Sequence, residues 1–238
     1  MRFFQRAFAI VGLSLSLGLM AASAGASPAN PVAGTDYIVL DTPQSTDSGK
    51  KIEVTEFFWY SCPHCNALEP ALEAWVAKQG DKIEFKRVPI SFDPRFVPQQ
   101  KLYYTLEALG QVSAMHKKVF NAIHVQRQSV DKDATILDFA VKQGLDKAKF
   151  ADAYNSFGVQ SKVNRATQLQ NAYKVEGVPM IAVDGRFVTA PSIVGKAMGN
   201  VPEAELFAAT LQVVDALIVK AAAEKNKTAA PPAQAKKK

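Results

Sequence analysis

Residues 51–65 read KIEVTEFFWYSCPHC, a strand-like run that leads directly into two cysteines three positions apart. Residues 51–60 are rich in β-branched and aromatic side chains, which favour strands, and we expect this strand to lie in the centre of a sheet. Apolar residues then recur at helical spacing over residues 66–79, and Gly80 is a typical helix end. Residues 82–88 predict another strand. A strand, a helix and a strand of these lengths form a βαβ unit with parallel strands.

The middle of the chain, from about Val97 to Tyr173, changes to a helical pattern of apolar residues. Several amphipathic pieces follow one another there, and Gly110, Gly144 and Gly158 are predicted to separate them. We interpret this part as an all-helical insertion in an α/β fold. One helical face is predicted from the spacing of Phe150, Ala153, Tyr154 and Phe157.

The chain after the insertion predicts a hairpin and a closing helix. Residues 180–183 and 186–189 form the two hairpin strands, because the Asp-Gly pair at 184–185 tolerates the positive φ of a type I′ turn. An amphipathic helix is expected over residues 203–223. Before the βαβ unit, residues 37–40 predict a further short strand.

The first twenty-six residues have the pattern of a secretory signal peptide. Arg2 and Arg6 precede an apolar run over residues 7–22, which ends in small residues. Cleavage is expected after Ala26, with Ala24 as the alternative site. A single retained membrane anchor is the alternative interpretation, but glycines and serines interrupt the apolar run.

The basic character of the chain is concentrated at its ends. The net charge is +6, but the leader holds two arginines and residues 225–238 hold five lysines and no acid, which leaves −1 for residues 27–224. A nearly neutral body argues against a nucleic-acid partner. We divide the chain into a signal peptide (1–26), a first part of the α/β domain with the cysteine motif (27–96), the helical insertion (97–173), the second part of the α/β domain (174–223) and a disordered tail rich in Lys, Ala and Pro (224–238).

The cysteine pair has several ordinary explanations besides redox chemistry. Covalent haem attachment requires a His directly after the second cysteine, where this chain has Asn66. A structural zinc needs four ligands, and beyond His64 only the remote His116 and His124 are available. We therefore expect no metal and interpret His116 and His124 as exposed or helix-capping residues. A structural disulfide across so short a loop would stabilise the fold little.

The position of the pair favours a reactive site. Cys62 falls near a helix N-cap and Pro63 at the first helical position, where the missing N–H does no harm. Helix N–H groups and the helix dipole then favour the Cys62 thiolate, and His64 can add a donor or a charge. We expect Cys62 to be the exposed, attacking sulfur and Cys65 the buried, resolving one. A stabilised thiolate stabilises the reduced form, which makes the disulfide a stronger oxidant.

Two motifs carry a resemblance to a known family. The segment EFFWYSCPHC at 56–65, followed by GVPM at 177–180, resembles the DsbA family of periplasmic disulfide oxidases, and the resemblance runs over residues 37–223. It implies a thioredoxin fold with a helical insertion, in agreement with the organisation predicted above.

The resemblance also implies roles for further residues. Val178–Pro179 would hold a cis peptide bond that faces the cysteines, so that the preceding backbone pairs with an extended client peptide. Glu56 would be a buried acid that takes part in proton transfer from Cys65, although an acid in a strand more often lies on a solvated face. The resemblance does not decide whether Lys86 or Arg87 is the basic partner of Glu56.

The predicted function is that of a periplasmic thiol:disulfide oxidoreductase. It would donate the Cys62–Cys65 disulfide to newly exported, cysteine-containing proteins through a mixed disulfide, act as a monomer and need no cofactor. The resemblance implies reoxidation by a DsbB-like, quinone-linked membrane oxidase. Two alternatives remain, because a thioredoxin fold does not by itself select the direction of electron flow. One is a disulfide isomerase or reductase, and the other is a peptide-binding chaperone with an incidental cysteine pair.

Overall fold

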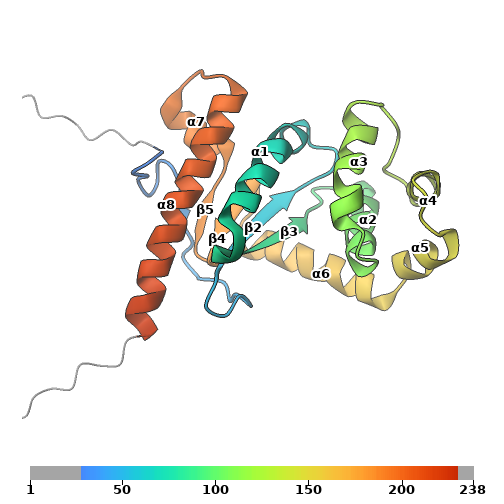
Figure 1. Ribbon diagram of the computed structural model, residues 1–238, viewed down its shortest axis with the longest axis horizontal. Coiled ribbons are helices and arrows are strands. Elements are labelled where there is room, and N and C mark those ends of the chain that lie inside the picture. The colour runs from blue at the N-terminus through green and yellow to red at the C-terminus, as the bar shows by residue number, and fades with distance from the viewer. Residues whose placement is uncertain (1–27, 230–238) are drawn as a thin grey trace, which may run out of the picture.

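A five-stranded mixed sheet forms the centre of the computed structural model, which describes residues 28–229 (Figure 1). The strands lie in the order β1-β5-β4-β2-β3. β2 is parallel to β3 and antiparallel to β4, so it lies inside the sheet, and all seven of its residues are buried. This agrees with the central strand predicted from its apolar composition. The strands are β1 (Ile38–Val39), β2 (Ile52–Phe58), β3 (Ile83–Pro89), β4 (Met180–Val183) and β5 (Phe187–Thr189).

Helix α1 (Pro63–Gln79) connects β2 to β3 and completes the predicted βαβ unit. It ends at Gly80, which has a φ of 56° that a residue with a Cβ adopts only with strain. A short 3-10 turn, Gly80–Lys82, then leads into β3. The helix begins three residues before the apolar periodicity does, because Pro63 is suited to the first helical position.

Five helices between β3 and β4 form the helical insertion, which lies on one side of the sheet, opposite α8 in Figure 1. Gly110 and Gly144 have positive φ and lie between helices, as predicted. The predicted break at Gly158 is wrong, because Gly158 lies inside a helix. The break falls earlier, where the Ser156 side chain accepts a hydrogen bond from the Val159 N–H. The helices are α2 (Val97–Ala108), α3 (Val112–His124), α4 (Asp133–Lys142), α5 (Lys147–Tyr154) and α6 (Phe157–Ala172), preceded by a 3-10 turn at Pro94–Phe96.

This early break also corrects the predicted apolar face. Phe150 and Tyr154 of α5 are buried and stack on each other, as expected. Phe157 is 87% exposed, because it begins a new helix with a different direction. The 3-4-7 spacing was therefore coincidental at its last position.

The second half of the sheet follows the predicted hairpin. Asp184 and Gly185 have φ values of 49° and 68°, and a Cβ on Gly185 would lie 2.0 Å from the Gln44 carbonyl oxygen. Only glycine therefore fits at position 185. Helix α7 (Pro191–Met198), which was not predicted, follows β5 and packs against α8.

Helix α8 (Glu203–Ala229) is longer than predicted, and residues 224–229 belong to it rather than to a disordered tail. Its last turns are attached to the sheet, because Glu224 pairs with Arg186 and the Lys225 amine lies 3.1 Å from an Asp184 carboxylate oxygen. Its length and composition would suffice to cross a membrane, but in this structure it packs on α1, β4 and β5. The predicted signal peptide and residues 230–238 lie outside the described residues.

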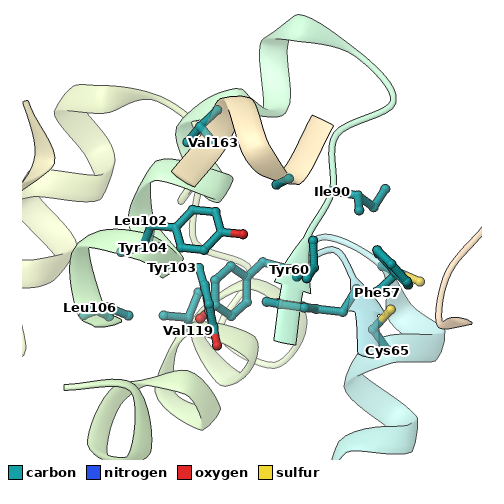
Figure 2. Close-up of a cluster of buried hydrophobic side chains, with 14 of the residues drawn as sticks. Phe57, Tyr60, Cys65, Ile90, Leu102, Tyr103, Tyr104, Leu106, Val119 and Val163 are labelled. Atoms are coloured by element: carbon teal, nitrogen blue, oxygen red, sulfur yellow. The ribbon is translucent and has the colours of Figure 1, made fainter. Parts of the chain in front are cut away.

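Two apolar cores lie on the two sides of the sheet. One is formed with α1 and α8, and the other is formed with the insertion and includes both cysteines. Figure 2 shows Cys65 and Phe57 in the second core, together with Tyr60 and residues of the insertion. The cysteine motif therefore contributes to the core between the sheet and the helical insertion.

Candidate active site

The cysteine pair lies where β2 ends and α1 begins. Cys62 is the N-cap residue of α1, and Pro63 is the first residue of the helix. Cys65 lies one turn further in and has no accessible surface, whereas Cys62 keeps 6% of its surface. The expected exposure of the Cys62 sulfur is therefore wrong for this structure. The Val178 carbonyl oxygen lies 3.4 Å from that sulfur, so the neighbouring segment shields it.

Both cysteines are free thiols, and their surroundings drive their pKa values apart. The pKa of Cys62 is lowered from 9.0 to about 6, chiefly by the hydrogen bond from the Cys65 side chain. Burial acts in the opposite direction, but the hydrogen bonds and the nearby charge together outweigh it. Backbone N–H groups of Cys65 and His64 lower it further, and the charge of His64 contributes least. Burial raises the pKa of Cys65 well above its usual value, and the Cys62 sulfur and Glu56 raise it more. These shifts favour a Cys62 thiolate that accepts a hydrogen bond from the Cys65 thiol. When Cys62 is protonated, its S–H donates to the Val178 carbonyl oxygen instead.

The segment that the resemblance assigned to client binding faces the pair. The Val178–Pro179 peptide bond is cis, and Val178 directs its carbonyl to Cys62. A groove of about 300 Å³ lies beside it and is mostly apolar. Its lining comes from α1, α7 and α8 as well as from this segment: His64, Val178, Pro179, Pro191, Ser192, Val201, Glu203, Leu206 and Phe207.

His64 has a partner that the sequence did not indicate. Its Nδ1 lies 2.6 Å from an oxygen of Glu203, in the first turn of α8. About two thirds of the His64 side chain is exposed, so the pair lies at the surface of the groove. The His64 side chain is therefore directed to Glu203, whereas the His64 backbone N–H donates a hydrogen bond to the Cys62 sulfur.

A buried charge cluster lies beneath the pair and resolves the open question about Glu56. Glu56 is fully buried in β2, and Arg87 of β3 is its partner, with Nε 3.0 Å from Glu56 Oε2. Arg87 also binds Glu69 of α1, at 2.6 Å. Burial raises the pKa of both carboxyls to about 7, against the lowering effect of Arg87. The Arg87 guanidinium thus binds both carboxyls. Their raised pKa values mean that each carboxyl is partly protonated at neutral pH.

Lys86 is not part of this cluster, since it pairs with Glu53 at 2.7 Å on the other side of the strand. Glu69 was missed by sequence reasoning, although a signal for it exists. It lies four residues after Cys65, so both side chains share one face of α1, and that face is buried.

The structure also changes the interpretation of the two remote histidines. His116 is buried, not exposed or capping, and its Nδ1 lies 2.8 Å from the Tyr60 hydroxyl. Burial lowers the pKa of His116 to about 3, so it is neutral. His124, at the end of α3, lies with Nε2 2.8 Å from the Tyr60 carbonyl oxygen. Within residues 28–229 no group of three His, Cys, Asp or Glu side chains is arranged to hold a metal ion.

A larger cavity of about 680 Å³ lies between β3, α2 and α6. Its lining mixes tyrosines with charged residues of both signs and includes neither cysteine. The groove beside Val178–Pro179 is smaller and is not lined by either cysteine, but Val178, which does line it, has its carbonyl oxygen 3.4 Å from the Cys62 sulfur. Position relative to the sulfur, rather than size, therefore makes the groove the candidate binding site.

A helix that begins with a low-pKa cysteine, backed by a buried thiol and built into a thioredoxin fold, defines a thiol:disulfide oxidoreductase. The family model of the DSBA-like thioredoxin domain matches residues 53–212. The chain belongs to the DsbA family, in which a depressed cysteine pKa is a known property.

Individual relatives agree with this assignment. The chain is 45% identical to thiol:disulfide interchange protein DsbA of Burkholderia cepacia over 207 residues, which cover 87% of this chain and 93% of that protein. It is 40% identical to the protein of the same name from Bordetella parapertussis, covering 86% and 94%. A crystal structure of Pseudomonas aeruginosa DsbA superposes with a TM-score of 0.73 at 33% identity, covering 82% of this chain and 96% of that one. The predicted thioredoxin fold with a helical insertion is thus confirmed.

Proposed function

We propose that this protein is a periplasmic disulfide oxidase that donates the Cys62–Cys65 disulfide to newly exported proteins. The observation that carries the proposal is the stabilised Cys62 thiolate, with a pKa of about 6. Groups that stabilise the thiolate stabilise only the reduced protein, so the disulfide accepts electrons readily. Each unit by which the thiolate pKa is lowered stabilises the reduced protein by about 1.4 kcal/mol, which corresponds to about 30 mV for a two-electron couple. Solvent screening at the groove reduces this effect.

In the proposed reaction a client thiolate attacks the Cys62 sulfur. The Cys62–Cys65 bond breaks, Cys65 leaves with the electron pair, and a mixed disulfide joins the client to Cys62. A second client thiolate then attacks the client sulfur of the mixed disulfide and expels Cys62 as a thiolate. Two electrons pass from the client to the pair. Of the two client protons, one is balanced by protonation of Cys65 and the other goes to solvent.

Glu56 is proposed to supply the proton that Cys65 needs. Its carboxyl has a pKa of about 7 and is close enough to Cys65 to raise the pKa of that thiol. A buried acid that is protonated near neutral pH can act as proton donor to a leaving sulfur. Arg87 then stabilises the carboxylate that remains.

The groove beside Pro179 is proposed to hold the client. An extended peptide that runs past Val178 would place its backbone against the Val178–Pro179 segment and its apolar side chains against Leu206 and Phe207. An apolar groove suits unfolded chains, because these expose the side chains that folding will bury.

Export and reoxidation complete the proposal. The predicted signal peptide at 1–26 would direct the chain to the periplasm and be removed there. A DsbB-like, quinone-linked membrane oxidase would restore the disulfide of a monomeric protein that carries no cofactor. The family assignment supports both points.

Glutathione equilibrium and client oxidation test this function together. The oxidised protein should introduce disulfides into a reduced, unfolded client and should be reduced by glutathione far more readily than a structural disulfide. A potential close to that of a cytosolic reductant would overturn the oxidase assignment in favour of a reductase. Client protection without disulfide transfer would favour the chaperone.

The variant His64→Ala should raise the Cys62 pKa by about one unit or less, within the range of ordinary environmental shifts. The shift is small because the largest stabilising contact comes from Cys65, and the backbone N–H of residue 64 remains. Client oxidation should slow in proportion. Thiolate absorbance against pH, together with glutathione equilibration, measures both effects. An unchanged pKa and an unchanged potential would show that the His64 side chain has no part in tuning the oxidant.

A further inference from the structure

A four-residue turn connects β2 to the reactive cysteine. The Cys62 N–H donates to the Trp59 carbonyl at 3.0 Å, which closes the turn. Tyr60 and Ser61 are its two central residues. The peptide group that joins them is therefore the central peptide of the turn, and it lies within two residues of the Cys62 sulfur.

The central peptide of such a turn can take two orientations. They correspond to turn types I and II, which share the same closing hydrogen bond and differ by rotation of the central peptide group. Type II needs a positive φ at the third residue of the turn, which is unfavourable for a serine, and Ser61 is not among the described non-glycine residues with positive φ. The type I orientation is therefore preferred locally, and the partner of the central carbonyl strengthens that preference.

That partner comes from the helical insertion. His124, the last residue of α3, lies with Nε2 2.8 Å from the Tyr60 carbonyl oxygen. A carbonyl oxygen can only accept, so Nε2 carries the hydrogen and donates it. His124 is half-buried and separated from Tyr60 by 64 residues of sequence, so this bond forms only in the folded protein.

The two side chains of the turn are held by the same insertion. The Tyr60 hydroxyl is 2.8 Å from His116 Nδ1, and burial raises the pKa of Tyr60 well above its usual value, so the hydroxyl keeps its proton and donates. Ser61 Oγ lies 2.8 Å from the side-chain nitrogen of Gln99, which donates to it and also to the Val130 carbonyl. Gln99 and His116 are both buried, and each binds one side chain of the turn.

We propose that His124 is a positioning residue that locks the central peptide of the turn, so that the Cys62 sulfur meets the N–H groups at the start of α1. His116 and Gln99 hold the two side chains of the same turn in support. The proposal deepens the proposed function, since it rests on the Cys62 thiolate as the reacting group. It also assigns the helical insertion a role in setting the oxidising strength of the pair.

Loss of the His124 bond should weaken the oxidant. A free Tyr60 carbonyl weakens the restraint on the central peptide, so that this peptide samples a wider range of orientations. Its dipole then moves relative to the sulfur, and the backbone that leads into Cys62 is loosened. The thiolate then loses part of its prearranged stabilisation. Its pKa rises, the reduced form becomes less favourable, and the disulfide becomes harder to reduce.

Paired substitutions at position 124 test this. His124→Leu fills a similar volume without a donor, and it should raise the Cys62 pKa by about one unit and shift the glutathione equilibrium about tenfold toward the disulfide. His124→Gln can donate from its amide and should restore both values. If the Leu variant does not fold, His124→Met replaces it, because its flexible side chain also lacks a donor and adds no charge.

Val119→Ala is the matched control. It removes buried apolar contacts from α3 but takes away no hydrogen-bond partner of the turn, so it should lower the denaturant midpoint and leave the Cys62 pKa unchanged. Equal thiolate titrations for the Gln variant and for the Leu or Met variant would overturn the proposal, as would a shift in Val119→Ala as large as that in His124→Leu. The titration needs no client, so an absence of client oxidation by the wild-type protein would overturn the proposed function separately.

Discussion

Cys65→Ser is expected to accumulate mixed disulfides with client proteins, whereas Cys62→Ser is expected to form none, and both variants should lose oxidase turnover completely. The structure gives the reason in the unequal positions of the two sulfurs. Cys62 keeps some accessible surface and lies beside Val178, which lines the groove, while Cys65 has no accessible surface. A client can therefore reach Cys62 but not Cys65. With Ser at position 65 no disulfide forms within the protein. A client joined to Cys62 can then no longer be released by attack of Cys65 on the mixed disulfide, which leaves only attack by a second client thiol.

Non-reducing electrophoresis of the two variants from cells measures this difference. Client adducts of Cys65→Ser should disappear on reduction, which is the internal control for a disulfide link. Adducts on Cys62→Ser at the same level as on Cys65→Ser would contradict the assignment of the attacking sulfur. The pKa of the remaining cysteine gives a second readout. Cys62 should titrate closer to an ordinary thiol in Cys65→Ser unless the new hydroxyl replaces the lost donor, because the largest cause of its depression is the Cys65 side chain.

Arg87→Leu is expected to lower the free energy of unfolding by about 3–5 kcal/mol at pH 8, the usual loss when a buried ion pair is broken from one side. The substitution leaves Glu56 and Glu69 buried without their cation. Near pH 5 the loss should be smaller, because both carboxyls then hold their protons and need no counter-charge. Urea unfolding of the oxidised proteins at the two pH values measures the difference.

The sign of the pH dependence follows from the two carboxyl pKa values. Each is raised from 4.5 in the unfolded chain to about 7 in the folded protein. The folded protein therefore binds more protons between those values, and the stability of the wild-type protein should fall as the pH rises from about 4.5 to about 7. Removing Arg87 raises both pKa values further, so the stability of the variant should continue to fall above pH 7, where that of the wild-type protein levels off.

Two further variants distinguish charge from packing. Arg87→Lys keeps the charge but cannot bind both carboxyls through a planar fork, so it should lose less stability than Arg87→Leu. Adding Glu69→Gln to Arg87→Leu should recover part of the loss at pH 8 and little at pH 5. A loss that is equal at both pH values would show that the Arg87 side chain stabilises the fold by packing alone.

Local chemistry made much of this protein predictable from its sequence. The strand of residues 52–58, the helix that begins at Pro63 and the hairpin turn at Asp184–Gly185 depend on neighbouring residues: β-branched side chains, a proline at the first helical position and a glycine at positive φ. The spacing of Cys62 and Cys65 on the first turn of that helix likewise carries its own chemistry.

The apolar spacing in the sequence misplaced two helix ends: it continues past the end of α5, and it stops before the end of α8. Phe157 continues the spacing of α5, but the capping hydrogen bond at Ser156 starts a new helix there and leaves the ring exposed. The lysine-rich end of the chain has the composition of a tail. Residues 224–229 are nevertheless helical, because α8 extends along the sheet and reaches the hairpin at Asp184.

What only the tertiary structure decided is which distant groups meet at the cysteines. Arg87, and not Lys86, binds Glu56 because strand alternation places the two neighbours on opposite faces of β3. His116 and His124 reach Tyr60 across more than fifty residues, and Glu203 reaches His64 from the start of α8. The sequence by itself determined the fold, the reactive pair and the direction of its pKa shift, since these follow from short-range preferences. The partners that set the size of that shift come from separate elements, and only packing brings them within hydrogen-bond distance.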